Sequence, residues 1–354
     1  MAKSDNSIIE KGKNLILSEK YDEALKYFKD IYDKNKENVI YPNYIGLVYL
    51  LKEEFKNAAD YFKKAIDVEP DNWYSYHKLG QICHIKKIEK CAIDYFTETI
   101  ERNPKDIYAF INLALIFEKE DQDLSIELIN SALEVDPLNL IANYLLGTIF
   151  LKQKDFKNAE KLLLNVTKKN SDFLMGWYKL GTLYFKMGKS KNAIETLSKA
   201  LSISKKPYIY NLLGLISLQR FKLDEAVDYL KESIKLDPED PSTWINLADA
   251  YQRGDKIDSA KLCLKEALKL TKNKDQEFSI WANYANCYEK EDKMNYCVYC
   301  LEQARECVTT NDSSKLEDFK EEESKMEYIH RISIALQNYE KEGHISRRPD
   351  DIDE

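Results

Sequence analysis

The chain of 354 residues is 44% hydrophobic and 32% charged, and it has only 10 glycines. Because long alternating β-branched runs are also absent, this composition predicts a mostly helical chain and argues against a large sheet. The net charge of −8 disfavours nucleic acids and anionic membranes as partners, since both are negatively charged.

Membrane and redox features of the sequence predict a cytoplasmic protein. The N-terminal residues form no apolar core of signal-peptide length, and no stretch approaches the length of a membrane span. The seven cysteines are odd in number and unevenly spread. This usage favours free thiols in a reducing compartment over a disulfide framework.

A small residue recurs along the chain with a period of about 34 residues, which is the mark of a repeat architecture. Gly12, Gly46 and Gly80 are 34 residues apart, as are Gly147 and Gly181. The complete series of small residues is Gly12, Gly46, Gly80, Ala114, Gly147, Gly181, Gly214, Ala248 and Ala285.

Two further positions repeat in phase with this one. Twelve residues later, most units have a second small residue: Ala24, Ala58, Ala92, Ala159, Ala193, Ala226, Ala260 and Cys297, with Ser125 one residue early. Four residues further comes a large apolar residue: Phe28, Phe62, Phe96, Ile129, Leu163, Leu197, Leu230, Leu264 and Leu301. Apolar residues at spacings of three and four predict two amphipathic helices in each unit. We expect the small residues to lie where the two helix backbones approach closely.

The pattern resembles the tetratricopeptide repeat, whose signature is Trp-x2-Leu-Gly-x2-Tyr followed by Ala, Phe, Ala and Pro. The unit that resembles it best contains Trp177, Leu180, Gly181, Tyr184, Ala193 and Ala200. The resemblance implies an all-α fold, an α-solenoid superhelix of helix-turn-helix repeats. We count nine units: 5–38, 39–72, 73–106, 107–139, 140–173, 174–206, 207–240, 241–274 and 278–309.

Residues 313–343 are predicted to form one long charged helix after the last repeat. Ser314 and Glu317 form a capping box at its start, and Gly343 is a suitable stop. Repeat arrays need a polar-faced cap over the exposed end of the stack, so this helix is the expected C-terminal capping helix. Residues 344–354 are predicted to be a flexible acidic tail. We also consider that its end, residues 349–354, occupies the groove near Lys179.

In tetratricopeptide repeat proteins the first helix of each pair lines a concave groove, so the resemblance implies a binding surface there. The positions not needed for packing lie six, three and two residues before the small residue and one after it; we call them groove positions. Many carry tyrosine or asparagine, which suit contacts with an extended peptide or a helix. The predicted groove residues are Tyr44, Tyr74, His77, Tyr108, Asn112, Tyr144, Tyr178, Tyr208, Asn211, Asn246 and Asn283. The alternative is that some of these tyrosines only pack between repeats.

Two functions of related repeat proteins are not supported by these positions. The carboxylate clamp of Hsp70/Hsp90 co-chaperones needs lysine, asparagine and arginine in three successive units. Around Asn112 the required positions hold His77, Gln81, Ile141 and Leu145, so recognition of a chaperone tail is not expected. The asparagine ladder of O-GlcNAc transferases is interrupted in units five to seven, and their catalytic domain is missing.

No catalytic or cofactor-binding motif is present in the sequence. There is no phosphate-binding loop, no GxSxG and no HExxH. Cys297 and Cys300 form a CxxC, but both fall on one predicted helix, where small buried residues are favoured over a zinc site. His77, His84 and Cys91 lack the further ligand that a metal would need. We expect neither a metal nor a cofactor.

The sequence therefore predicts a non-catalytic scaffold or adaptor that binds a peptide or helix of a partner protein in the groove. Two alternatives remain open at this stage. One is a structural subunit of a larger complex, in contact through other faces. The other is a regulatory partner of a separate catalytic chain, such as a glycosyltransferase.

Overall fold

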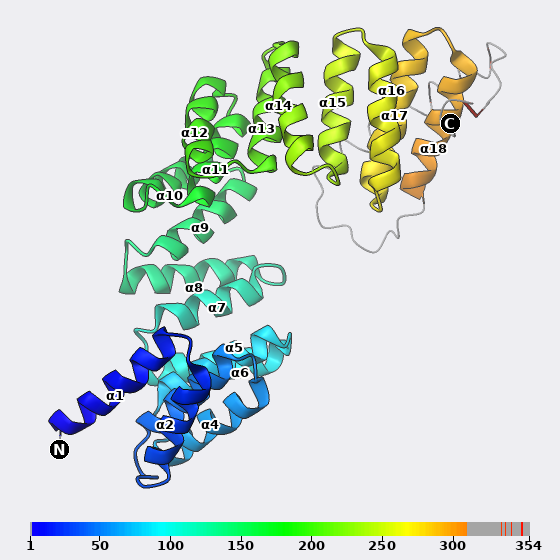
Figure 1. Cartoon of the computed structure of the whole chain (residues 1–354). Helices are drawn as coiled ribbons and strands as arrows, with labels where there is room; N and C mark the ends of the chain where they lie inside the picture. Colours follow the sequence, from blue (N-terminus) through cyan, green and yellow to red (C-terminus); the bar gives the residue numbers. More distant parts are fainter. Residues whose placement is uncertain (1, 310–333, 335–336, 338–340, 342–347, 350–354) are drawn as a thin grey trace. The chain divides into compact units, whose positions relative to one another are not determined.

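All regular structure in the described part of the chain is helical. The computed structural model describes residues 2–309 together with residues 334, 337, 341, 348 and 349. Within these residues there are 18 α-helices and no strand, which confirms the predicted all-α fold of paired helices (Figure 1). The capping helix predicted over 313–343 and the tail predicted over 344–354 lie outside the continuously described residues.

The chain divides into two compact units, residues 1–170 and 171–354, which we call unit 1 and unit 2. In unit 1 each odd-numbered helix packs against the helix that follows it, and successive pairs pack on one another. Its helices are α1 (Ala2–Leu17), α2 (Tyr21–Tyr32), α3 (Ile40–Leu51), α4 (Phe55–Val68), α5 (Trp73–Ile85), α6 (Glu89–Arg102), α7 (Ile107–Phe117), α8 (Gln122–Val135), α9 (Leu140–Lys152) and α10 (Phe156–Lys169).

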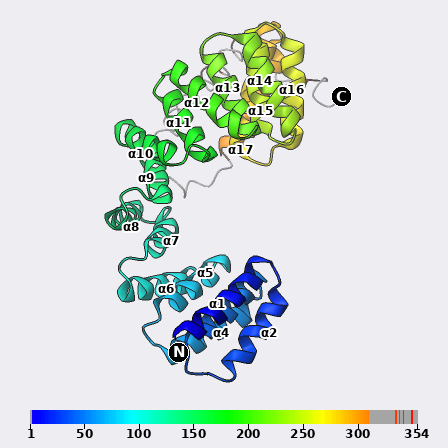
Figure 2. The same ribbon diagram turned by 60° about the vertical axis from the view of Figure 1, so that its left-hand side comes forward.

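Unit 2 repeats the same arrangement of paired helices, seen from two directions in Figures 1 and 2. Its helices are α11 (Leu174–Lys186), α12 (Ser190–Ile203), α13 (Pro207–Gln219), α14 (Leu223–Leu236), α15 (Pro241–Arg253), α16 (Ile257–Leu270), α17 (Lys274–Lys290) and α18 (Met294–Thr309). The helix α17 begins earlier than the other first helices because Asp275, Gln276 and Glu277, the three residues that interrupt the repeat spacing, extend its N-terminal end.

Each repeating glycine makes room for the large apolar side chain sixteen residues later. A Cβ atom added to Gly46 would lie 2.9 Å from the Phe62 ring, and one added to Gly181 would lie 2.6 Å from Leu197. Phe62 and Leu197 are both fully buried. The close approach predicted from the sequence is therefore real, and the second helix fills it with one side chain per repeat.

The turn inside most helix pairs contains one residue in the left-handed backbone region. These residues are Glu19, Glu53, Lys87, Lys154, Gly188, Phe221, Asp255 and Asp292. Left-handed geometry is common just after a helix C-terminus, where glycine adopts it most easily. The pair α7–α8 has no such residue, which agrees with the unit 107–139 being one residue short at this turn.

Asparagine or aspartate caps the first helix of several pairs, two residues after the proline that ends the preceding unit. Asn72 accepts a hydrogen bond from the Ser75 N–H at the start of α5. Asp106 accepts from two backbone N–H groups at the start of α7, and Asp240 does the same at α15. Such caps satisfy backbone donors that the helix itself leaves unpaired. They fix where each first helix begins, and hence where its groove positions lie.

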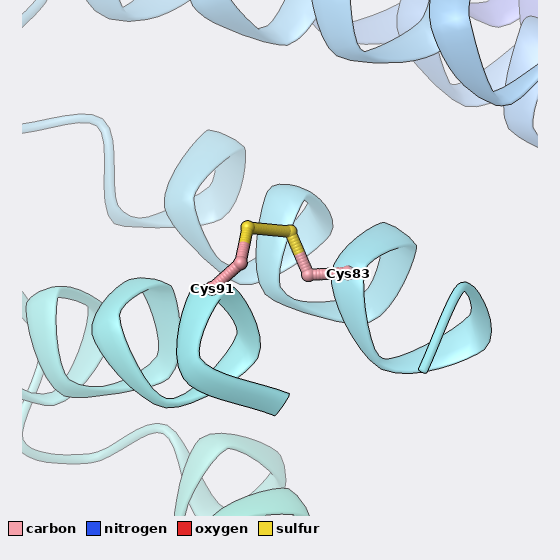
Figure 3. Close-up of a disulfide and its surroundings, with 2 residues drawn as sticks. All are labelled: Cys83 and Cys91. Carbon is pink, nitrogen blue, oxygen red and sulfur yellow. A yellow bond between two sulfur atoms is a disulfide. The ribbon is translucent and has the colours of Figure 1, made fainter. Parts of the chain in front are cut away.

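The expectation that the cysteines are free thiols is wrong for Cys83 and Cys91, which form a disulfide (Figure 3). Cys83 lies near the end of α5 and Cys91 near the start of α6, so the bond joins the two helices of one pair. The antiparallel hairpin brings these residues together, with 5.7 Å between their Cα atoms. Spacing along the sequence did not reveal this proximity, because the two residues occupy different repeat positions.

Candidate partner-binding groove

The four groove positions of α3 line one cavity of about 410 Å³ in unit 1. Its walls are Ile40, Asn43, Tyr44 and Leu47 from α3, closed by Tyr74 from α5; we call it the α3–α5 cavity. The Tyr44 ring stacks on the buried Phe28 at 4.9 Å, which holds the ring in place. Apart from Asn43 and the two tyrosine hydroxyls the wall is apolar, so this cavity suits an aliphatic or aromatic side chain.

A second cavity of about 310 Å³ lies beside α5 and α7. Tyr74 lines both cavities, so the two adjoin; we call the second one the α5–α7 cavity. Its lining residues are Trp73, Tyr74, His77, Lys78, Asn103, Lys105, Asp106, Ile107 and Tyr108. Unlike the first cavity, this one includes two lysines, a histidine and a carboxylate.

His77 and Asp106 form a buried pair at the wall of the α5–α7 cavity. His77 Nδ1 lies 3.0 Å from Asp106 Oδ2, and both side chains are less than a tenth exposed. Burial raises the pKa of Asp106, but the contact with His77 and the N–H groups of Ala109 and Tyr108 outweigh it and hold this pKa below its usual value. The Asp106 carboxylate is thus already engaged by groups of this chain.

Lys78 differs from Asp106 because its hydrogen bond and its ring contact are with neutral groups, the Gln81 amide and the Tyr74 ring. Lys78 Nζ donates a hydrogen bond to Gln81 Oε1 at 3.0 Å and lies 5.3 Å from the centre of the Tyr74 ring. Burial lowers the pKa of Lys78, and the Asp106 charge acts in the opposite direction. An ammonium group has three N–H donors. Since Lys78 makes one hydrogen bond with the described residues, it can donate a further one to an acceptor group of a ligand.

Tyr74 and Tyr108 supply aromatic surface on either side of Lys78. Burial raises the pKa of Tyr74 to about 12, so its hydroxyl stays protonated and can donate. Tyr108 is 56% exposed. One turn further along α7, Asn112 is partly buried, and its side chain makes no hydrogen bond with the residues that the structure describes. These groups leave both apolar area and hydrogen-bonding capacity available.

Tyr144 on α9 is partly buried and sits three residues after Ile141, another groove position, which is 41% exposed. In unit 2 the predicted tyrosines contact each other: the Tyr178 and Tyr208 rings are 4.7 Å apart in an edge-to-face arrangement. The Tyr208 hydroxyl also lies 3.6 Å from Met175 Sδ. These rings pack between repeats, as the alternative interpretation of the tyrosines anticipated.

The predicted asparagines of unit 2 are likewise engaged within the chain. Asn246 Nδ2 donates to Asn211 Oδ1 at 2.8 Å, which joins α15 to α13. Asn283 Nδ2 donates to the Ser279 carbonyl in its own helix at 2.8 Å. In unit 1, by contrast, Asn112 makes no hydrogen bond through its side-chain amide with the described part of the chain.

Several lining residues were not among the predicted groove residues. Ile40, Leu47 and Lys78 occupy groove positions, so the repeat pattern could have included them. Trp73, Lys105 and Asp106 lie at or before the start of a first helix, outside the groove positions. In the sequence, only Pro104 and the capping residue Asp106 indicated that the loop before α7 is held against this helix.

No group of three or more candidate ligands that could hold a metal ion occurs among the described residues. Cys263, Cys287 and Cys307 are buried, and burial raises the pKa of each thiol, to about 12 for Cys263. Protonated thiols are poor nucleophiles and poor ligands. No helix of the described residues is long and apolar enough to cross a membrane.

The stacked helix pairs identify this chain as a helical repeat protein. Its first helices carry an apolar surface with hydrogen-bonding groups. Three tetratricopeptide repeat family models match this chain, over residues 9–76 and 117–173, over 176–207 and over 217–279. The matched ranges together cover more than half of the sequence. The chain therefore belongs to the tetratricopeptide repeat superfamily, as its sequence pattern predicted.

Similar proteins extend the family assignment without adding a specific function. TPR repeat-containing protein C19B12.01 of Schizosaccharomyces pombe is 28% identical over 130 residues, which are 36% of this chain and 15% of that protein. The match thus spans less than a sixth of the length of this relative.

Solved structures of tetratricopeptide repeat proteins share the fold. The APC/C hetero-tetramer Cut9–Hcn1 has a TM-score of 0.54 and 14% identity over 82% of this chain and 56% of that one. PilW, a type IV pilus biogenesis factor, has a TM-score of 0.51 and 17% identity over 58% of this chain and 96% of that one. At these identities the similarity concerns the fold alone.

Tetratricopeptide repeat proteins generally mediate protein–protein interactions and the assembly of complexes. Proteins of this family are typically non-catalytic scaffolds. These general properties bear on the two cavities of unit 1, which lie along the first helices.

Proposed function

We propose that this chain is a non-catalytic scaffold or adaptor that binds a segment of a partner protein along α3, α5, α7 and α9 of unit 1. The observation that carries the proposal is the pair of adjoining cavities that share Tyr74. They combine apolar walls with a few polar groups, among them the Lys78 ammonium, which is the usual composition of a binding site. Tyr44, Tyr74, His77, Tyr108, Asn112 and Tyr144 are the proposed contact residues.

A protein segment suits these cavities better than a nucleic acid or a membrane surface. The net charge of −8 repels polyanions, and only a few lysines line the cavities. Tyrosine rings offer rigid contact area at low entropic cost. The Asn112 amide can donate to and accept from a peptide backbone.

We further propose that the array comprises nine repeats with the boundaries given above, followed by a capping helix over residues 313–343. Cytoplasmic location stays a prediction from the sequence. The Cys83–Cys91 disulfide is the observation that opposes it, because disulfides persist mainly in oxidising compartments.

The proposal can be tested with two matched double variants of the full chain. Tyr108→Ala with Ile141→Ala removes two groove side chains that are 56% and 41% exposed. Leu51→Ala with Ile88→Ala removes two apolar side chains that are 45% and 51% exposed and lie outside the groove positions. Immobilised wild-type and variant chains are incubated with cell extract, and the retained proteins are quantified by mass spectrometry.

We expect the groove variant to lose proteins that the wild type and the control variant retain. Loss of two aromatic or aliphatic anchors reduces binding by about tenfold or more. Circular dichroism must show the same helicity for all three chains. Equal retention by both double variants would refute binding through this groove.

A further inference from the structure

The α5–α7 cavity carries a local positive charge although the whole chain is acidic. Lys78 and Lys105 line it together with one carboxylate, that of Asp106. Asp106 is committed to His77 and to the N-terminus of α7, at distances of 3.0 to 3.1 Å. The lysines therefore outnumber the acidic groups in the cavity wall.

Lys78 is the better placed of the two lysines for holding a ligand. It lies on α5 between Tyr74 and Gln81, and its position is fixed by contacts with both. Because it is partly buried, a charge placed beside it is screened less than one at the surface. A carboxylate is the protein group that pairs best with such an ammonium.

The adjoining α3–α5 cavity differs in chemistry, since Ile40, Leu47 and the faces of Tyr44 and Tyr74 form most of its wall. It suits a large apolar side chain. Neighbouring packed helices are about 8–10 Å apart. An extended chain advances about 3.3 Å per residue, so two or three residues separate side chains that enter adjoining cavities.

We propose that unit 1 selects partner segments in which an aspartate or glutamate lies within about four residues of a leucine, isoleucine, valine or phenylalanine. The carboxylate binds Lys78 Nζ in the α5–α7 cavity, and the apolar side chain enters the α3–α5 cavity. This specificity rests on the proposed function, because it assigns chemistry to the same groove. It requires no terminal carboxylate, and it differs in this respect from the chaperone clamp whose residues are missing here.

The test is a selection of random twelve-residue peptides displayed on phage against the full chain. Peptides enriched on the wild type are synthesised, and their dissociation constants are measured for the wild type, Lys78→Met and Lys78→Glu. Lys78→Met removes the charge and keeps most of the side-chain volume. Lys179→Glu is the matched control, because Lys179 occupies the same groove position on α11 in unit 2.

We expect the enriched peptides to carry an acidic residue near an apolar one. Their affinity should fall by about tenfold or more in Lys78→Met, as for loss of one charged hydrogen bond, and stay unchanged in Lys179→Glu. A peptide with lysine in place of its acidic residue should bind Lys78→Glu better than it binds the wild type.

Two results overturn the proposal, and they are distinguishable. Enriched peptides that depend on Tyr108 but lack an acidic residue, or that bind Lys78→Met as tightly as the wild type, refute the acidic specificity and leave the groove in place. If no enriched peptide loses affinity in either Tyr108→Ala or Lys78→Met, both the specificity and the proposed function are wrong.

Discussion

Units 1 and 2 share one helical repeat but use its groove positions differently. In unit 1, Tyr74 and Lys78 line cavities, and Asn112 makes no side-chain hydrogen bond with the described residues. One asparagine of unit 1 is nevertheless bonded to the next repeat: Asn43 Oδ1 accepts a hydrogen bond from the Ser75 hydroxyl at 2.6 Å. In unit 2, Asn246 bonds to Asn211 across two repeats, and the Tyr208 ring packs on Tyr178. A donor that is bonded within the chain contributes to stability, and it is no longer available to a ligand. A groove position of this repeat can thus be left open to solvent or be bonded to the neighbouring repeat, depending on which side chains meet there, and only the open positions enter the proposed binding surface.

The packing beneath the groove should be equally important in both units, and this is the largest effect we predict. Phe62 and Leu230 are fully buried, each against a glycine of its own pair. We expect Phe62→Ala to cost about 3–5 kcal/mol and Leu230→Ala about 2–5 kcal/mol, because each leaves a cavity.

Hydrogen exchange read by mass spectrometry checks this prediction helix by helix, because repeat arrays need not unfold in one step. Exchange should rise first in α3 and α4 for Phe62→Ala, and in α13 and α14 for Leu230→Ala. A loss below about 1 kcal/mol in either unit would mean that the glycine contact is not a core contact there.

Among the described residues only those of unit 1 include a disulfide, which gives the second prediction. Reducing Cys83–Cys91, or replacing both residues by serine, should lower the stability of unit 1 by about 2–3 kcal/mol, the value for a short loop. Thermal unfolding with and without reductant measures the change. The double serine variant is the control, since reductant should leave it unaffected. Alkylation of all seven cysteines before any reduction would contradict the bond.

The repeat packing was predictable from sequence, whereas the groove contacts were predictable only in part. The sixteen-residue spacing from Gly46 to Phe62 recurs in eight of the nine repeats, and the spacing from Ala114 to Ile129 is one residue shorter. The sequence therefore shows many times that a small residue must lie under a large one. The loop that brings Lys105 and Asp106 into the α5–α7 cavity has no such repeated signal.

Whether an asparagine is bonded or open depends on its neighbours in three dimensions. Asn246 and Asn112 occupy the same groove position, two residues before the small residue. Asn246 is bonded to Asn211, which lies in the preceding repeat. In the repeat that precedes Asn112, the position equivalent to Asn211 is occupied by His77. His77 is already engaged by Asp106. The sequence placed both asparagines in one series, because this difference arises only when residues of adjacent repeats are brought together.

The His77–Asp106 pair predicts a pH dependence confined to unit 1. The Asp106 pKa is lower in the folded chain than its ordinary value of 3.8. The ionised carboxylate therefore stabilises the fold above about pH 4, and this stabilisation is lost as the pH falls through the folded pKa. Asp106→Asn can still cap α7, so we expect a loss of about 1–2 kcal/mol at pH 7. Denaturant unfolding between pH 3 and 7 should show this difference shrinking towards pH 3; a constant difference would exclude an electrostatic origin.

The smallest effect separates bracing from binding most directly. Asn246→Ala breaks the bond to Asn211 and should cost about 1 kcal/mol of stability. Asn112→Ala breaks no hydrogen bond among the residues that the structure describes and should change stability by less than about 0.5 kcal/mol. Binding should show the reverse order. A peptide selected on the wild type should lose affinity for Asn112→Ala and keep it for Asn246→Ala. If Asn246→Ala weakens binding as much as Asn112→Ala, the bonded asparagines of unit 2 also contact the ligand, and the proposed division between the two units is wrong.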